Sequence, residues 1–335
     1  MTCPQANRWR VIHLGTLALA LVLLAAPFRA DAQAVKVFRI GWLGFVLPTN
    51  LEVRVLEDAF VEALRAQGFV EGRNIVIERR WTEGRAQQAT SAAAEFVQMK
   101  VDVIVVVDSK AAHAAKQATS TIPIVMVAVA NPEQQGLVAS LGRPGGNLTG
   151  MSNVSAESSG RTLQILKEVF PQRIRVAILW NPELQGSANW LQADVSRAKA
   201  LGMEPIALAV SSADDLERAL DSVIHERADV LYPQLALWAH RARIQDFAAK
   251  QRLPTVTGAR QWSQLGALLT YGADPRDLFQ RSAVYVAKIL RGAKPADLPV
   301  EQSSKFELVI NMKTAKALGI TIPASVLQQA DEIIE

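Results

Sequence analysis

Val101-Asp-Val-Ile-Val-Val-Val107 is the stretch that decides the fold class of this chain. It is a nearly continuous run of β-branched residues, without the polar alternation of a half-exposed strand. Such a run is typical of a strand buried on both faces, and strands of that kind belong to parallel sheets. The stretch therefore predicts an α/β fold with helices on both faces of the sheet.

Strand and helix patterns alternate on both sides of this run, and the alternation occurs twice. In the first half we predict strands at 38–43, 74–80, 101–107 and 122–129, with helices at 52–67, 86–100 and 110–119. In the second half we predict strands at 175–180, 205–210, 229–234 and 254–258, with helices at 188–201, 213–226 and 239–252. A helix at 278–290, a strand at 306–311 and a helix at 324–334 follow.

The two halves show a faint internal echo and are separated by breakpoints. Val101–Ile104 (VDVI) resembles Ala228–Leu231 (ADVL), although the intervening lengths differ and the shared order could arise by chance. A Gly-, Pro- and Asn-rich stretch at 142–150 is typical of a linker or hinge. Further breakpoints are predicted at 269–272 and after Gly292.

The first 32 residues differ from the rest and predict an export signal. Arg8 and Arg10 precede an apolar run from Leu14 to Ala26, and Ala30-Asp-Ala32 is a small-x-small cleavage pattern. The run is shorter than the roughly 20 residues of a membrane-spanning helix. We therefore expect a cleaved signal peptide and a periplasmic product.

Cysteine and charge narrow the remaining classes. The one cysteine, Cys3, precedes the apolar run, so it cannot be the lipidated cysteine of an anchored lipoprotein, and no disulfide scaffold is possible. The net charge of the whole chain is +4, and part of this excess belongs to the signal. Basic residues are scattered except for small clusters such as Arg241 and Arg243, so nucleic-acid binding is not expected.

Catalytic and cofactor patterns are missing from the sequence. His113, His225 and His240 lack zinc-ligand spacing, no Gly-x-Ser-x-Gly is present, and the 142–150 glycines lack the Lys-Ser/Thr of a P-loop. Gly41-Trp-Leu-Gly44 lacks the third glycine of a dinucleotide fingerprint. We expect no catalytic residue, metal or cofactor, and hence no enzyme.

Several segments taken together resemble one known family. They are 64–74 (LRAQGFVEGRN), 121–125 (TIPIV), 136–150 (GLVASLGRPGGNLTG), 287–301 (AKILRGAKPADLPVE) and 306–311 (FELVIN). The chain resembles the periplasmic substrate-binding proteins of ATP-driven (ABC) uptake systems, in their tryptophan-binding-like branch. The likeness covers nearly all of the chain after the signal.

The resemblance implies a type I periplasmic binding protein fold, in which two doubly wound lobes are joined by three crossovers. The expected division is signal peptide 1–32, first lobe 36–150 plus about 273–304, and second lobe 151–272 plus about 305–335. Two loops depart from the family pattern, at Val107-Asp108-Ser109 and at Asn131-Pro132. Both loops follow predicted strands, where the ligand is expected to bind. The resemblance therefore predicts the fold better than it predicts the identity of the ligand.

Ligands of open parallel sheets bind beyond the carboxyl ends of the strands, which gives a set of candidate residues. In the first lobe the candidates are Phe45, Thr49, Asn50, Asp108, Ser109 and Asn131. In the second lobe they are Trp180, Asn181, Tyr232, Gln234, Gly258 and Trp262. Tyr271 and Asp274 lie at the second crossover.

The roles of some candidates stay open between two interpretations. Ser109 and nearby backbone N–H groups could hold a carboxylate, or Ser109 could be an ordinary N-cap. Asp108 could pair with a ligand ammonium or act as a cap. Trp180 is expected to line the site, whereas Trp42 is expected in the core.

These features predict an exported solute-binding component that closes around a small ligand and delivers it to an inner-membrane ABC permease. The ligand is expected to be an amino acid or related zwitterion, with a sugar or other polar solute as the alternative. A periplasmic sensor domain for a signalling receptor, and an exported enzyme, are the rival classes. The protein is expected to be a monomer.

Overall fold

The computed structural model describes residues 36–44, 51–83, 85–153, 156–172, 174–184 and 186–335. The strands are β1 Phe38–Gly44, β2 Ile75–Trp81, β3 Val103–Val106, β4 Ile124–Val129, β5 Leu148–Ser152, β6 Arg175–Trp180, β7 Glu204–Ala209, β8 Val230–Pro233, β9 Val256–Thr257, β10 Leu269–Ala273, β11 Glu301–Gln302, β12 Phe306–Asn311 and β13 Glu332–Ile334. The α-helices are α2 Leu51–Ala66, α3 Ala86–Gln98, α4 Ser109–Ala118, α5 Ala156–Val169, α6 Ser187–Ala200, α7 Ala213–His225, α8 Arg241–Gln251, α9 Pro275–Leu290, α10 Met312–Leu318 and α11 Ala324–Leu327. Short 3-10 helices are η1 Leu235–His240, η2 Arg260–Leu265 and η3 Pro295–Asp297. The predicted signal peptide lies outside the described residues.

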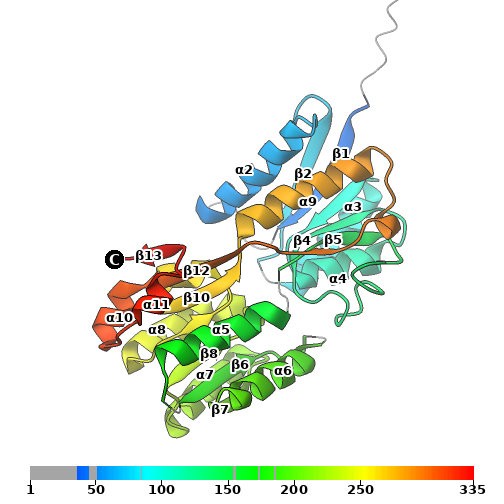
Figure 1. The fold of residues 1–335 in the computed structure, drawn as a ribbon. Helices are drawn as coiled ribbons and strands as arrows, with labels where there is room; N and C mark the ends of the chain where they lie inside the picture. Colours follow the sequence, from blue (N-terminus) through cyan, green and yellow to red (C-terminus); the bar gives the residue numbers. More distant parts are fainter. Residues whose placement is uncertain (1–35, 45–50, 84, 154–155, 173, 185) are drawn as a thin grey trace, which may run out of the picture. The chain divides into compact units, whose positions relative to one another are not determined.

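The first sheet has the strand order β11-β5-β4-β3-β1-β2, and its pairings are parallel. Helices α2 and α9 pack on one face, and α3 and α4 pack on the other (Figure 1). β3 lies in the middle and its residues Val103–Val106 are buried. The doubly wound parallel sheet predicted from the run at 101–107 is confirmed.

The second sheet consists of β7-β6-β8 and β9-β10-β12-β13, which meet at a parallel bridge between Leu231 and Thr255. Its order from β7 to β10 repeats the order of the first sheet from β2 to β5. The repeat ends at the edge, where β11 runs parallel to β5 but β12 runs antiparallel to β10. Helices α5 and α6 contribute to one apolar layer, and α7 and α8 to the other.

The chain passes between the two sheets three times: after β5, after β10 and after β11. Backbone hydrogen bonds join these crossover segments to one another. Ser303 N donates to Ser152 O at 3.1 Å, and Asp274 N donates to Lys305 O at 3.0 Å. The three-crossover connection expected from the resemblance is therefore present.

The internal echo has a structural counterpart at the amino ends of the strands. In the first sheet, Arg39 N donates to Asp102 Oδ2 at 2.7 Å, and Asp102 N donates to Arg39 O at 2.7 Å. In the second sheet, Arg175 N donates to Asp229 Oδ2 at 2.7 Å, and Asp229 N donates to Arg175 O at 2.8 Å. The same two-bond clamp thus aligns β1 with β3 and β6 with β8.

Glycines 41 and 44 have packing roles. A Cβ on Gly41 would lie 2.7 Å from the ring of Phe96, and a Cβ on Gly44 would lie 2.9 Å from the indole of Trp81. Aromatic rings of neighbouring elements occupy the space beside each glycine. The two glycines of the Gly41-Trp-Leu-Gly44 stretch therefore allow close packing of aromatic rings.

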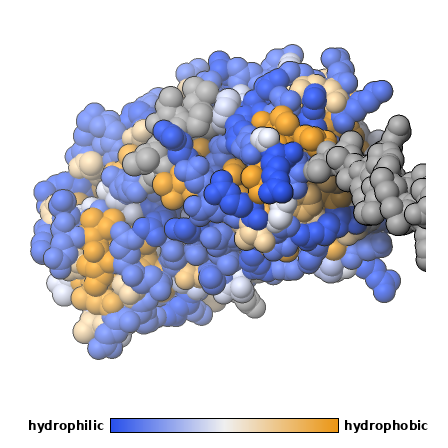
Figure 2. All heavy atoms as spheres, turned by 90° about the horizontal axis from the view of Figure 1, so that it is seen from above, coloured by the Kyte–Doolittle hydropathy of each residue, from blue (hydrophilic) through white to orange (hydrophobic). Residues whose placement is uncertain are grey.

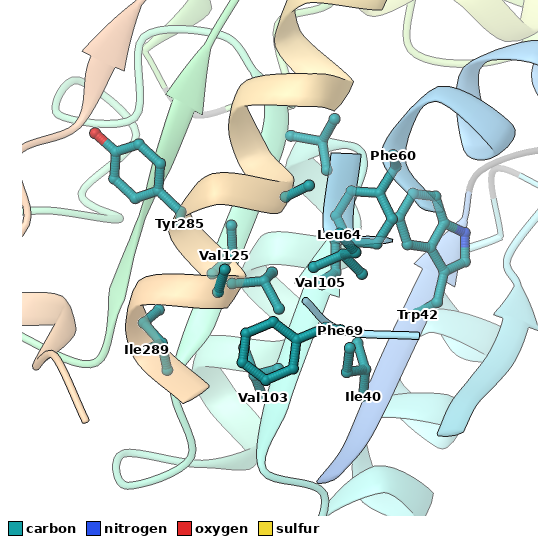
Figure 3. Close-up of a cluster of buried hydrophobic side chains, with 14 of the residues drawn as sticks. Ile40, Trp42, Phe60, Leu64, Phe69, Val103, Val105, Val125, Tyr285 and Ile289 are labelled. Carbon is teal, nitrogen blue, oxygen red and sulfur yellow. The ribbon is translucent and has the colours of Figure 1, made fainter. Parts of the chain in front are cut away.

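The apolar core on the α2 and α9 face is rich in aromatic rings. Trp42 is 2% exposed, and its ring centroid lies 4.8 Å from that of Phe60. Figure 3 shows the rings of Phe60 and Trp42 side by side, with Leu64 next to Val105 of the sheet, whereas the Tyr285 ring on α9 points away from them. The prediction that Trp42 belongs to the core is confirmed.

One expected helix is wrong, and two expected breakpoints lie a few residues before the observed crossovers. The predicted helix 324–334 ends at Leu327, and residues 332–334 form β13, because Asp331 N bonds to Leu308 O and aligns the tail with β12. The breakpoint expected at 269–272 is itself strand β10, and the chain crosses to the first sheet directly after this strand. The linker at 142–150 ends inside β5, so the first crossover comes only after Ser152.

In the described part of the chain, no helix is long and apolar enough to cross a bilayer. The face in Figure 2 is mostly hydrophilic, with apolar side chains in separate patches. The large apolar side chains that are more than a third exposed are Val37, Val55, Val76, Ile224, Leu265 and Ile333.

Candidate functional site

The carboxyl ends of β1, β2, β3 and β4 share one edge of the first sheet, because these strands are parallel. Ligands of open parallel sheets bind beyond this edge. Asp108 and Ser109 follow β3, and Asn131 follows β4, as predicted. The candidates Phe45, Thr49 and Asn50 lie outside the described residues.

Asp108 is the N-cap of α4 and leaves one carboxyl oxygen open. Its Oδ1 accepts hydrogen bonds from the N–H groups of Lys110 at 2.7 Å and Ala111 at 3.0 Å. Its Oδ2 is buried and has no hydrogen-bond partner among the described residues. Burial raises the pKa of the carboxyl, and the two N–H donors offset only part of that rise. Asp108 is therefore both a cap and an open acceptor.

Two backbone N–H groups in the first turn of α4 already have an acceptor. The capping Asp108 uses the N–H groups of Lys110 and Ala111, and its charge repels a second carboxylate. Ser109 Oγ accepts a hydrogen bond from Gln135 Nε2 at 3.0 Å. Asp108, and not Ser109, is therefore the N-cap of α4, and carboxylate binding by Ser109 stays a prediction.

Asn131 begins the turn that carries Gln135. Its φ of 40° is in the left-handed region, which Asn tolerates better than most residues. Gln135 N donates to Asn131 O at 3.2 Å, and Gln135 Oε1 lies 3.2 Å from His113 Nε2. Gln135 is 1% exposed, so it fixes the loops after β3 and β4 relative to each other.

Trp81 stands at the same edge and was missed by the sequence reasoning. It ends β2, pairs in register with Gly44, and its indole Nε1 is buried without a partner among the described residues. A hollow of about 270 Å³ beside it is also lined by Gln88, whose Oε1 is equally without a partner. The strand-end rule applied to β2 would have identified Trp81.

The second sheet presents the corresponding edge at the ends of β6, β8, β9 and β10, which run parallel. Trp180 and Asn181 lie at the end of β6, Gln234 after β8, Gly258 after β9 and Tyr271 in β10. Trp180 is partly exposed, unlike Trp42. The structure therefore brings four of the predicted residues to one edge, with Tyr271 in the middle of β10 and packed against the α5 layer.

Gln234 also leaves one oxygen open. It is 8% exposed, its Nε2 donates to Asp194 Oδ2 at 3.0 Å, and its Oε1 has no partner among the described residues. Asp194 lies on α6 and is 4% exposed. Burial raises the pKa of Asp194, against the hydrogen bonds from Gln234 and Ser159 and the charge of Arg197.

A cavity of about 500 Å³ lies next to this group. Arg197 Nη1 donates to Ser159 Oγ at 3.0 Å, which links Arg197 to the Asp194 carboxyl. The rings of Tyr271 and Phe306 stack with centroids 5.7 Å apart and planes 15° apart. The cavity is lined by Ser158, Gly160, Arg161, Gln164, Arg197, Tyr271 and Phe306.

Three predicted residues lie in other surroundings. Trp262 is 0% exposed inside the apolar layer of α7 and α8, so we remove it from the candidate site. Tyr232 is 6% exposed within the α5 layer, and burial raises the pKa of its phenol. Asp274 caps α9, because its Oδ1 accepts a hydrogen bond from Arg276 N at 2.8 Å. Among the described residues no group of His, Cys, Asp and Glu could hold a metal ion.

Comparison with known proteins decides the family. The model of the ABC transporter substrate-binding protein family matches residues 53–334. The chain belongs to this family. Its fold is that of the type I periplasmic binding proteins, which its structural neighbours share.

Relatives of this substrate-binding protein include amino-acid binders. It is 29% identical over 263 residues to a tyrosine-binding protein of Clostridioides difficile, covering 78% of this chain and 75% of that one. It is 25% identical to an ABC domain from Streptococcus pneumoniae solved in complex with L-Trp, with a TM-score of 0.82 over 89% of this chain and 100% of that one. A ligand-free, open substrate-binding protein with adhesive properties from Clostridium difficile matches with 25% identity and a TM-score of 0.68, over 89% and 99% of the two chains. Such relatives are solute-binding proteins, and the family is typically extracellular or periplasmic.

Proposed function

We propose that the protein is the exported solute receptor of an ABC uptake system and that its solute is an amino acid with an aromatic side chain. In this proposal the signal 1–32 is removed, and the mature chain captures the solute between the carboxyl edges of its two sheets. Closure about the three crossovers adds contacts that exist only in the closed form, which a membrane permease then recognises. The lobes are those expected from the sequence, adjusted so that the first crossover follows Ser152.

The observation that carries this proposal is a pair of open oxygens at equivalent positions. Asp108 follows β3, which pairs with β1, and Gln234 follows β8, which pairs with β6. Asp108 Oδ2 and Gln234 Oε1 are both buried without a donor among the described residues. A buried acceptor without a donor costs about 1–3 kcal/mol, so a ligand that supplies N–H groups gains where it meets them. An ammonium group has three such donors.

Aromatic residues support the choice of solute. Trp81 and Trp180 end β2 and β6 at the two edges, and Tyr271 and Phe306 stack beside the second. Aromatic walls favour planar apolar groups, and each good ring pair contributes about 0.5–1.5 kcal/mol beyond its buried area. One relative is named for tyrosine and another was solved with L-Trp.

The test is calorimetric titration of the mature chain, residues 33–335, with L-tyrosine, L-tryptophan, L-leucine, glucose and ribose. We expect binding of an aromatic amino acid, and a loss of roughly 10- to 100-fold in affinity with Asp108→Asn, because the ligand ammonium loses its charged acceptor. Asp246→Asn is the matched control, since Asp246 is an exposed carboxylate on α8 that pairs with Lys250. Binding of a sugar but no amino acid, or an unchanged affinity in Asp108→Asn, would contradict the proposal.

A further inference from the structure

The cavity beside α5 and α6 contains a guanidinium without a carboxylate partner. No carboxylate of the described residues lies within 4.0 Å of Arg197, whose hydrogen bond goes to the neutral Ser159 Oγ at 3.0 Å. The other arginine of the cavity, Arg161, lies 3.4 Å from Glu168. Arg197 therefore has the guanidinium donors available for an anion, in a partly buried position.

Part of the lining of the same cavity is aromatic. Tyr271 and Phe306 come from β10 and β12, which pair antiparallel, and their rings are stacked and nearly parallel. Both side chains are partly buried. A planar apolar group and an anion are thus both favoured within one cavity of about 500 Å³, a volume ordinary for small-molecule sites.

Arg197 belongs to a network of polar side chains that also includes a buried carboxyl group. Asp194 and Arg197 lie three residues apart on α6, and Ser159 bonds to both. Gln234, with its open Oε1, bonds to the other side of Asp194. The network therefore runs from an open acceptor, through a carboxylate, to an open cation. An α-amino acid carries an ammonium group that can donate to such an acceptor and a carboxylate that can bind such a cation.

We propose that this cavity is the carboxylate and ring subsite of the solute, with Arg197 binding the carboxylate and Tyr271 flanking the ring. The inference rests on the proposed function, because it assigns the second sheet's part of that solute site. It is an alternative to the carboxylate site expected at the start of α4, where Asp108 already accepts hydrogen bonds from Lys110 N and Ala111 N.

The experiment compares removal of the cation with removal of the anion. Wild type, Arg197→Gln and Arg197→Lys are titrated with L-tyrosine and with tyramine, which lacks the carboxylate. We expect tyramine to bind wild type roughly 10- to 100-fold more weakly than L-tyrosine. Arg197→Gln should weaken L-tyrosine by a similar factor and leave tyramine almost unchanged. Arg197→Lys should have an intermediate affinity for L-tyrosine, because lysine keeps the positive charge but lacks the paired N–H donors of the guanidinium.

Matched controls separate binding from folding. Arg243→Gln changes an arginine on α8 that pairs with the exposed Glu217, and should leave both affinities unchanged. Circular dichroism and melting temperature establish that each variant is folded. The subsite is overturned if Arg197→Gln binds L-tyrosine within about twofold of the wild-type affinity. It is also overturned if this variant loses affinity for L-tyrosine and tyramine equally.

Further probes distinguish this inference from the proposed function. If wild type binds 3-phenylpropionate or benzoate in an Arg197-dependent way but no amino acid, the subsite stands and the amino-acid proposal fails. If wild type binds an amino acid with no dependence on Arg197, the proposed function stands and the subsite fails. If it binds no aromatic carboxylate at all, the subsite is wrong.

Discussion

The loop after β3 in the first sheet and the loop after β8 in the second occupy equivalent places in the strand order, but their polar side chains differ. The strand order from β2 to β5 is repeated from β7 to β10, and the Asp102 clamp is repeated by Asp229. After β3, however, Asp108 caps a regular helix, whereas after β8 Gln234 leads into the 3-10 helix η1. Each residue ends with one buried oxygen that lacks a donor.

The difference lies in which residue supplies the carboxyl group. In the first sheet the strand-end residue Asp108 carries it and accepts the N–H groups at the start of α4. In the second sheet the strand-end residue Gln234 is an amide, and it donates to the carboxyl group of Asp194 on α6. The comparison teaches that a repeated fold fixes the positions of functional residues without fixing their chemistry.

Gln234→Glu gives the largest expected effect, because it places a second carboxylate against Asp194. Two buried carboxyls in contact cannot both ionise, so the folded-state pKa of the pair rises above the unfolded value. Stability is then retained below the unfolded pKa and lost as the pH rises through the folded pKa. We expect a loss of about 3 kcal/mol in the free energy of unfolding at pH 8, with much of it recovered near about pH 5. Urea denaturation at both pH values measures it.

Gln234→Met is the control for that variant, since it removes the amide without adding charge. Its effect should be nearly the same at both pH values. A Gln234→Glu protein as stable as wild type at pH 8 would show that Asp194 and Gln234 do not meet as described.

Asp108→Asn should have a smaller effect of the opposite sign. Burial raises the pKa of Asp108, so the ligand-free protein loses stability as the pH rises through that folded pKa. Asn still caps α4 but has no charge to bury, so the variant should be more stable than wild type at pH 8 by about 1 kcal/mol. Thermal melts from pH 4 to pH 9 should show the gain disappearing toward low pH. A gain that is constant with pH would rule out this cause.

The two clamps should give the smallest effect and the closest match. Asp102→Ala and Asp229→Ala each remove a carboxylate that accepts one backbone N–H, at 2.7 Å in both sheets. Each variant should lose about 1 kcal/mol of unfolding free energy. Chemical denaturation of both variants and of the double variant measures it. If the two losses of unfolding free energy differ by more than about 1 kcal/mol, the two clamps share a geometry but do not contribute equally to stability.

Much of the fold follows from local pattern, and the misses have physical causes. The buried run at 101–107 and the alternation around it predict the parallel strands, because periodicity reports how many faces of an element are buried. Breaks were expected at 142–150, which is rich in Gly, Pro and Asn, and at 269–272. The structure pairs 148–152 with β4 and 269–273 with β9 and β12, and pairing between segments far apart in the chain is not visible in a local pattern. At Gly272 a Cβ would lie 1.8 Å from Gly258 O, so the glycine allows a close approach of two strands there.

Part of the proposed site follows from the sequence. The strand-end rule predicts Asp108 and Gln234, because the ends of parallel strands are visible in the sequence, and Tyr271 is predicted from its place at the second crossover. It could not find Arg197, which lies in the interior of α6 and reads as an ordinary helical cation. It also retained Trp262, which the packing of α7 and α8 buries completely.

The sequence by itself determined the class of the fold, its repeated order and its family, because these depend on burial patterns and motifs along the chain. Only the tertiary structure decided which groups face each other without a partner. Asp108 Oδ2, Gln234 Oε1 and the Arg197 guanidinium come from segments far apart in the chain. Whether a polar atom is satisfied depends on neighbours within about 3 Å in space, and a linear sequence does not specify those neighbours.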